Sequence, residues 1–209
     1  LVVPALEALS DEELEKQLHE INTERAFVVA EALRRGVSLE HVYDVTKIDI
    51  WFLKKVQNIV EMEQALRLLG SIEKLDRDML MDAKKMGMCD KAIARFVSSD
   101  ELTIRAMRKE LNILPAFRKV DTCGGEFEAV SPYFYSVYGG ATEAFNSGRK
   151  TVVVLGSGPI RIGQGIEFDY CSVHCVWALK KAGFDTVIIN NNPETVSTDF
   201  DTADRLYFE

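Results

Sequence analysis

The fold of the second half of the chain is decided by residues 151–165, which read TVVVLGSGPIRIGQG. The apolar run from Thr151 to Leu155 is typical of a strand buried in a parallel sheet. The glycines after it let backbone N–H groups approach a ligand closely, and a helix that starts there favours an anion at its N-terminus. A helical pattern follows from Phe168 to Lys181 and ends at Gly183. The stretch therefore predicts a strand, a glycine-rich loop and a helix.

Two more strands are predicted after this helix. Thr186–Ile189 is a second buried strand, and Arg205–Phe208 has the pattern of a third. A strand–helix–strand unit of this kind forms a parallel sheet with a right-handed crossover, as in Rossmann-like folds. Ligands of such sheets bind beyond the carboxyl ends of the strands. We therefore expect the loop of residues 190–195, NNNPET, to share one crevice with the glycine-rich loop.

The glycine-rich loop departs from two known phosphate-binding patterns. A dinucleotide fingerprint needs a third glycine where the sequence has Arg161, and an acid after the second strand, where it has Asn190. A P-loop needs Lys and then Ser or Thr, but Gly163 is followed by Gln164-Gly165. The missing lysine excludes a P-loop. A dinucleotide site stays open as an alternative, and otherwise the loop serves another ligand or a neighbouring domain.

Residues 1–115 are predicted to form a bundle of short helices. A capping box at Ser10–Glu13 opens the first helix, and a second box at Ser98–Glu101 opens the last. The longest helix begins at Asp49 and ends at Gly70. Further helix caps are expected at Asn22, Ser38, Asp76 and Asp90. Helices this short are not stable alone in water, so they must pack on one another.

Residues 116–150 differ from both neighbouring parts of the chain. They are rich in glycine and carry the aromatic run Tyr133–Tyr135. We interpret them as an extended connector with room for a short strand, held to a neighbouring surface by the aromatic side chains. The predicted fold class is therefore mixed: an all-α helical domain at 1–115, the connector at 116–150, and a Rossmann-like α/β unit with a parallel sheet at 151–209.

Composition counts against several classes of protein. The 209 residues carry a net charge of −8, and no segment has the basic surplus that binding to nucleic acid requires. No apolar run approaches the roughly 20 residues of a membrane span. The four cysteines include no Cys-x-x-Cys pair, which predicts free thiols and a cytoplasmic protein. The chain starts without Met and stops after the apolar run Leu206–Phe208, so we expect it to be a piece of a longer chain.

One group of side chains suggests a metal. Cys171, His174 and Cys175 stand at i, i+3 and i+4 of the predicted helix. A structural zinc needs a fourth ligand and usually paired cysteines on a turn. We therefore predict no metal site and interpret the two cysteines as small buried thiols beside the sheet.

Three further stretches belong together. Residues 119–123 read KVDTC, residues 158–170 read GPIRIGQGIEFDY, and residues 192–199 read NPETVSTD. The first resembles the connector before the second half of the carbamoyl-phosphate synthase large subunit. The second resembles the loop that opens a synthetase half of that family, and the third resembles its second-strand loop. The resemblance is specific over residues 119–209 and loose over the helices, and Gly124 and Gly125 stand where alanine is common in the family.

The resemblance implies a longer chain with two homologous halves, each a Rossmann-like pre-ATP-grasp domain followed by an ATP-grasp domain. Residues 1–150 would belong to a helical oligomerisation domain between the halves, and residues 151–209 would open the second, carbamoyl-phosphate-forming half. The implied enzyme is an ATP-dependent ligase of arginine and pyrimidine synthesis. It phosphorylates bicarbonate with one ATP, and ammonia derived from glutamine displaces that phosphate. The resulting carbamate travels inside the protein to the second half, where the second ATP phosphorylates it.

For this chain the resemblance implies no catalytic residue and no complete active site. The ligands of ATP and its Mg or Mn ion belong to ATP-grasp domains, so we expect neither to bind here. The loop around Gly165 and Glu167, with the facing loop at Glu194, would border the carbamate route. The residues expected to line the route or its pocket are Arg161, Gln164, Gly165, Glu167, Asn192 and Glu194, and the structural glycines of the loop are Gly156, Gly158 and Gly163. In the other interpretation, Glu167 only stabilises the first turn of its helix.

The implied partners are the rest of the large subunit, the glutaminase small subunit and a second copy through the helical domain, with no nucleic acid and no membrane. Two other functions stay open. One is a stand-alone dinucleotide-binding oxidoreductase domain with a helical cap, and the other is a non-enzymatic helical interaction module. A small sheet with an unprotected edge strand also predicts association or aggregation, and we expect Leu206–Phe208 to cause it.

Overall fold

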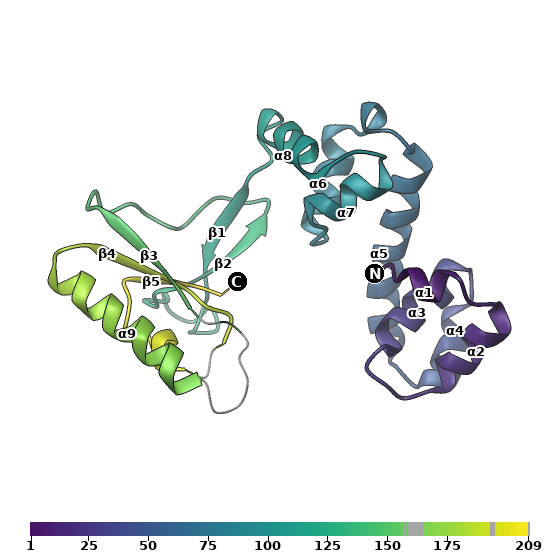
Figure 1. Ribbon diagram of the computed structural model, residues 1–209, viewed down its shortest axis with the longest axis horizontal. Coiled ribbons are helices and arrows are strands. Elements are labelled where there is room, and N and C mark those ends of the chain that lie inside the picture. The colour runs from purple at the N-terminus through teal and green to yellow at the C-terminus, as the bar shows by residue number, and fades with distance from the viewer. Residues whose placement is uncertain (157, 159–164, 193–194, 209) are drawn as a thin grey trace. The chain divides into compact units, whose positions relative to one another are not determined.

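The first half of the chain is built of helices (Figure 1). The structure is a computed structural model, and it describes residues 1–156, 158, 165–192 and 195–208. It divides into two compact units, Leu1–Ile113 and Leu114–Glu209. The elements of the first unit are α1 (Pro4–Glu7), α2 (Asp11–His19), α3 (Arg25–Arg34), α4 (Leu39–Thr46), α5 (Ile50–Leu69), the 3₁₀ turn η1 (Ile72–Lys74), α6 (Arg77–Lys85), α7 (Asp90–Phe96) and α8 (Glu101–Glu110).

Most of the predicted helix starts are confirmed by the hydrogen bonds of the caps. Ser10 and Glu13 form the capping box at the start of α2, with each side chain bonded to the other residue's backbone N–H. The side chains of Ser38, Asp49 and Asp76 accept hydrogen bonds from the first turns of α4, α5 and α6. These short polar side chains satisfy N–H groups that have no partner inside the helix.

Three predicted caps are wrong. Asn22 accepts a hydrogen bond from the N–H of Glu24 in a turn before α3, and Glu24 is the N-cap residue of that helix. The second capping box does not form, because the side chain that caps α8 is Asp100 and Ser98 lies in the left-handed region with φ of 54°. Asp90 is the first residue of α7 and accepts hydrogen bonds from Lys84 and Arg108.

An apolar core and an ionic cluster are among the contacts that hold the first unit together. Apolar side chains from α1 to α5, among them Leu18, Val28 and Leu53, form a buried core. A second cluster is ionic and joins α6, α7 and α8. In it the carboxylate of Asp90 accepts a hydrogen bond of 2.8 Å from Lys84 Nζ and one of 2.9 Å from Arg108 Nε. All three of these side chains are buried.

The second unit is a five-stranded, mostly parallel sheet with a helix on one face (Figure 1). Its elements are β1 (Pro115–Lys119), β2 (Tyr133–Tyr138), β3 (Thr151–Leu155), α9 (Gly165–Lys181), β4 (Asp185–Ile189), the 3₁₀ turn η2 (Val196–Thr198) and β5 (Arg205–Tyr207). The strand order among the described residues is β1-β2-β5-β4-β3, with β1 and β2 antiparallel and the other pairs parallel. The mixed fold class predicted from the sequence is confirmed.

The stretch of residues 116–150 does more than connect the two parts, because it supplies β2 and most of β1. Its aromatic side chains pack on the last strand, as expected of a pinned segment. The ring of Phe134 stacks on that of Tyr207 at 5.4 Å between centroids, and the ring of Tyr133 lies 5.5 Å from that of Phe208. The three domain ranges 1–115, 116–150 and 151–209 stay a prediction.

The prediction that Leu206–Phe208 form an exposed edge is wrong. β5 pairs with β2 on one side and with β4 on the other, and Leu206 is buried. The outer strands are β1 and β3. β1 is covered along its outer edge by the segment at Glu143, whose N–H donates to Phe117 O and whose carboxylate accepts from the N–H of Lys119.

Candidate functional site at the carboxyl end of the sheet

The loops that follow β3 and β4 begin at the same edge of the sheet, as the parallel pairing of these strands requires. Gly156 N donates a hydrogen bond of 2.8 Å to Ile189 O at the strand ends. A Cβ added to Gly156 would lie 2.6 Å from Asn190 Cβ. Only glycine fits at this point against the loop that follows β4, so Gly156 has a packing role.

Asn190 is directed into the protein instead of towards a ligand. The residue is 3% exposed. Its Nδ2 donates a hydrogen bond of 3.2 Å to Ser197 Oγ, and its Oδ1 accepts one of 3.2 Å from the N–H of Asn192. An acid at this position would hold a ribose hydroxyl in a dinucleotide site. The inward bonds of Asn190 therefore count against the dinucleotide interpretation.

Asp169 binds the loop that follows β4 to α9. Its side chain lies on the face of the helix that is turned to the sheet and is 7% exposed. The two carboxylate oxygens accept hydrogen bonds from Ser197 N, at 3.1 and 3.3 Å. Further bonds keep the loop folded beyond this point, since Thr198 Oγ1 donates to Thr195 O at 2.7 Å and Thr202 Oγ1 donates to Val196 O at 2.8 Å. We call the set Gly156, Asn190, Ser197 and Asp169 the loop clasp.

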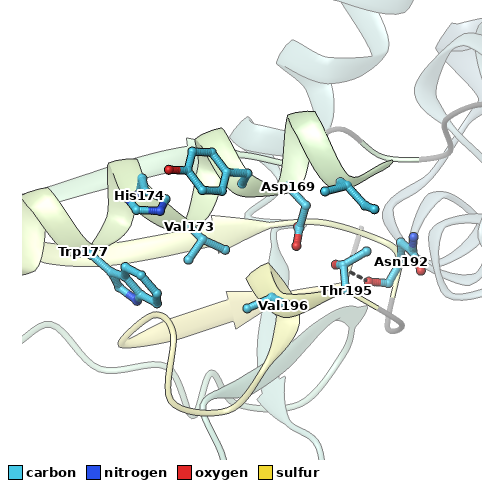
Figure 2. Close-up of a pocket in the computed structure, with 9 residues that line it drawn as sticks. Asp169, Val173, His174, Trp177, Asn192, Thr195 and Val196 are labelled. Carbon is cyan, nitrogen blue, oxygen red and sulfur yellow. Dashed lines mark hydrogen bonds between the residues drawn. The ribbon is translucent and has the colours of Figure 1, made fainter. Parts of the chain in front are cut away.

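A groove of about 560 Å³ runs along α9 beside the clasp (Figure 2). It is lined by Ile166, Asp169, Tyr170, Val173, His174, Trp177, Asn192, Thr195 and Val196. The imidazole of His174 lies between two aromatic rings, 4.1 Å from that of Tyr170 and 5.2 Å from that of Trp177, measured between centroids. Tyr170 and Trp177 remain 61% and 50% exposed, so one wall of the groove is an open aromatic surface.

The residues that were predicted to line a route or pocket fall into two groups, those that the structure describes and those outside the described residues. Asn192 lines the groove, Gly165 is the first residue of α9, and Glu167 is exposed in the first turn of that helix. Of the predicted structural glycines, Gly158 has a φ of 62°, which a larger residue rarely adopts. The predicted residues Arg161, Gly163, Gln164 and Glu194 lie outside the described residues. Both interpretations of Glu167 therefore stand as predictions.

Sequence reasoning missed the clasp. Asp169, Val173 and Val176 follow one another at helical spacing, and all three are buried. A carboxylate on an otherwise apolar helix face needs hydrogen-bond donors, because burying an unpaired charge is costly. The serine- and threonine-rich loop after β4 could supply such donors from its backbone N–H groups. This combination was the signal that could have identified Asp169.

All four cysteines are free, as predicted, but the prediction that Cys171 and Cys175 are buried is wrong. Cys171 and Cys175 are exposed on α9, as is His174. Within residues 1–156, 158, 165–192 and 195–208, no group of three or more His, Cys, Asp or Glu side chains is placed to hold a metal ion. The described helices also include none long and apolar enough to span a membrane.

Two family models match the chain, one for each unit. Residues 2–112 match the oligomerisation domain of the carbamoyl-phosphate synthetase large chain, and residues 148–209 match the preATP-grasp domain of carbamoyl phosphate synthase.

Full-length relatives agree with these matches. The carbamoyl phosphate synthase large chain of Agathobacter rectalis is 54% identical over 202 residues, which cover 96% of this chain and 18% of that protein. The same large chain from a Thermoanaerobacter species is 51% identical over 204 residues, covering 98% of this chain and 19% of the relative. The chain thus spans less than a fifth of the length of these curated relatives.

Proposed function

Because the chain belongs to the family of carbamoyl phosphate synthase large chains, we propose that it acts as the central part of such an ATP-dependent ligase. The helical unit supplies a self-association surface, and the sheet unit opens the carbamoyl-phosphate-forming half. The order of the two matched family models along the chain supports this arrangement. The whole enzyme would make carbamoyl phosphate from bicarbonate, glutamine-derived ammonia and two ATP, for arginine and pyrimidine synthesis.

The part of this chain in the reaction is to guide an intermediate. The start of α9 and the loop after β4 border the route by which carbamate reaches the second site. The observation that carries this proposal is the loop clasp, in which Asn190 binds the hydroxyl of Ser197 and Asp169 of α9 binds its N–H. A carboxylate at Glu167 or Glu194 would repel the carbamate anion unless it is paired with a donor, and Arg161 is the candidate donor.

No nucleotide or metal step is assigned to this chain. Mg or Mn with ATP would supply phosphoryl-transfer chemistry in the whole enzyme, but the described residues bring no set of metal ligands together. We propose that the ligands for ATP and its metal ion belong to other parts of the large chain. This chain by itself is proposed to be inactive.

The partners follow from the same assignment. They are the remainder of the large chain, the glutaminase small subunit and a second copy of the helical unit. The match of residues 2–112 to an oligomerisation domain supports the last of these. The four free cysteines favour the reducing cytoplasm as the compartment.

A calorimetric titration of the chain with Mg-ATP, and then with NADH, tests this function. We expect no heat of binding from either ligand, because the loop at residues 156–165 borders a route and is no cofactor site by itself. Binding of NADH with micromolar affinity would replace the proposal by the dinucleotide-binding oxidoreductase. Tight binding of Mg-ATP would show that the nucleotide ligands lie in this chain.

A further inference from the structure

We propose that Asp169 is a positioning residue, which keeps the loop after β4 in place along the carbamate route. The inference rests on the proposed function and adds a residue that neither the sequence motifs nor the family matches single out. Its basis is the position of one buried carboxylate between two segments of chain that are distant in sequence. Asp169 lies in α9, and the N–H group that it binds belongs to Ser197, 28 positions further along.

The clasp fixes the loop at both of its ends. At the first end, Asn190 N donates to Tyr207 O at 3.1 Å, and the Asn190 side chain packs against Gly156. At the second end, Ser197 is held by Asp169 through its N–H and by Asn190 through its hydroxyl. Asn192, Thr195 and Val196, which lie between these two ends in the sequence, line the groove along α9.

Asp169 is the member of the clasp that relates this loop to the helix. The other bonds of the clasp join the ends of β3, β4 and β5 to the loop, and each would survive if α9 moved away. The Asp169 carboxylate alone in this set comes from α9, two residues after Glu167. A hydrogen bond to a charged group is stronger than a neutral one, so this contact ties the loop after β4 to the start of α9.

The packing beneath α9 does not depend on this carboxylate. Val176, Ile188, Ala203 and Leu206 form the buried cluster between the helix and the sheet. Loss of Asp169 should therefore release the loop and leave the sheet unit folded. A released loop leaves the route open to water, and carbamate that escapes has already consumed the first ATP.

The first test measures the clasp in this chain. Hydrogen exchange of the Ser197 amide, followed by NMR, is compared in the parent chain, Asp169→Ala, Asp169→Asn and the exposed control Asp201→Asn. We expect exchange about tenfold faster or more in Asp169→Ala, because the hydrogen bond to a charged acceptor is lost. Asp169→Asn keeps one acceptor oxygen and should lie in between, while Asp201→Asn should match the parent. Equal exchange in all four chains would overturn the clasp.

The second test places the same substitutions in a full-length large chain assembled with its glutaminase subunit. The quantity measured is the ATP consumed per carbamoyl phosphate formed, which is two in the proposed reaction. A misfolded fraction lowers ATP use and product together and leaves this ratio unchanged, whereas an escaping intermediate raises it. We expect the ratio to rise about twofold or more in Asp169→Ala and to be largely restored in Asp169→Asn, since shifts of about 1 Å can have large effects on reaction steps.

The outcomes separate the two proposals. Faster exchange at Ser197 with an unchanged ratio would make Asp169 a purely structural residue and leave the proposed function intact. A parent enzyme that forms no carbamoyl phosphate would instead remove the proposed function itself.

Discussion

At the scale of single residues, the closest packing in the site is at Gly156. This glycine has no left-handed backbone to explain it, and its requirement comes from the nearby side chain of Asn190. We expect Gly156→Ala to lower the free energy of unfolding by about 1–3 kcal/mol, because the added methyl group overlaps atoms close to a backbone. Urea denaturation, followed by a spectroscopic signal of the sheet unit, measures this change in the free energy of unfolding.

A double-mutant cycle gives the control for this residue. If the overlap with Asn190 is the cause, Gly156→Ala should cost less in a chain that already carries Asn190→Gly. If Gly156→Ala lowered the free energy of unfolding equally with and without Asn190→Gly, the strain would lie elsewhere in the loop.

Single residues also show which contacts could be predicted from the sequence and which could not. The starts of the two loops, at Gly156 and Asn190, were expected at one edge and lie there, because parallel strands leave their carboxyl ends together. Helical spacing marks Asp169 as a buried carboxylate, but its partner could not be read from the sequence, since the N–H of Ser197 lies 28 positions away. The same holds for Asp90, whose place before a helical run suggests a cap although its carboxylate is bound by Lys84 and Arg108.

At the scale of elements, the ionic cluster of Asp90 joins α6, α7 and α8. Removal of one member of a buried ion pair leaves an unpaired buried charge and typically costs about 3–5 kcal/mol. We expect Asp90→Ala to destabilise the helical unit by an amount in that range. The exposed Asp78→Asn in α6 is the matched control and should leave the unfolding midpoint unchanged.

The same cluster predicts a dependence on pH. Burial acts to raise the pKa of Asp90, but the hydrogen bonds from Lys84 and Arg108 outweigh it and lower the pKa below its ordinary value. The stability that this carboxylate contributes is therefore present above the unfolded-state pKa of about 3.9 and is lost as the pH falls through the lower folded-state pKa. Thermal unfolding followed from about pH 5 downwards should show a shallower acid loss in Asp90→Asn than in the parent chain. Parallel curves would contradict the assignment.

Elements whose partners are distant in the chain were the least predictable. The helices of the first unit were largely found from their local patterns of apolar residues and caps. β1 and β2 were interpreted as a connector, because among the described residues β1 pairs only with β2, and β2 is held in the sheet by β5, some 70 positions later at Tyr133↔Leu206. A strand's neighbours decide whether it forms, and the neighbour that joins Tyr133–Tyr138 to the rest of the sheet is distant in the sequence.

At the scale of the whole molecule, the question is which surface drives association. The family match assigns oligomerisation to residues 2–112, yet the sheet unit also carries an apolar edge strand in β3. Among the described residues β3 pairs only with β4, and its Val153 and Leu155 are 50% and 73% exposed. An apolar edge strand offers unpaired backbone groups and an apolar surface to a second chain.

Two charge substitutions distinguish the two surfaces. Val153→Lys places a charge on the edge strand, where lysine is known to block pairing between sheets, and Leu102→Lys places one at an exposed site of α8 in the helical unit. We expect Val153→Lys to remove large, concentration-dependent aggregates in light scattering and to leave a small defined oligomer, since we propose that this oligomer forms through the helices. If Val153→Lys instead gave a monomer, the oligomer would form through the sheet, and the helical unit would not be the self-association surface of this chain.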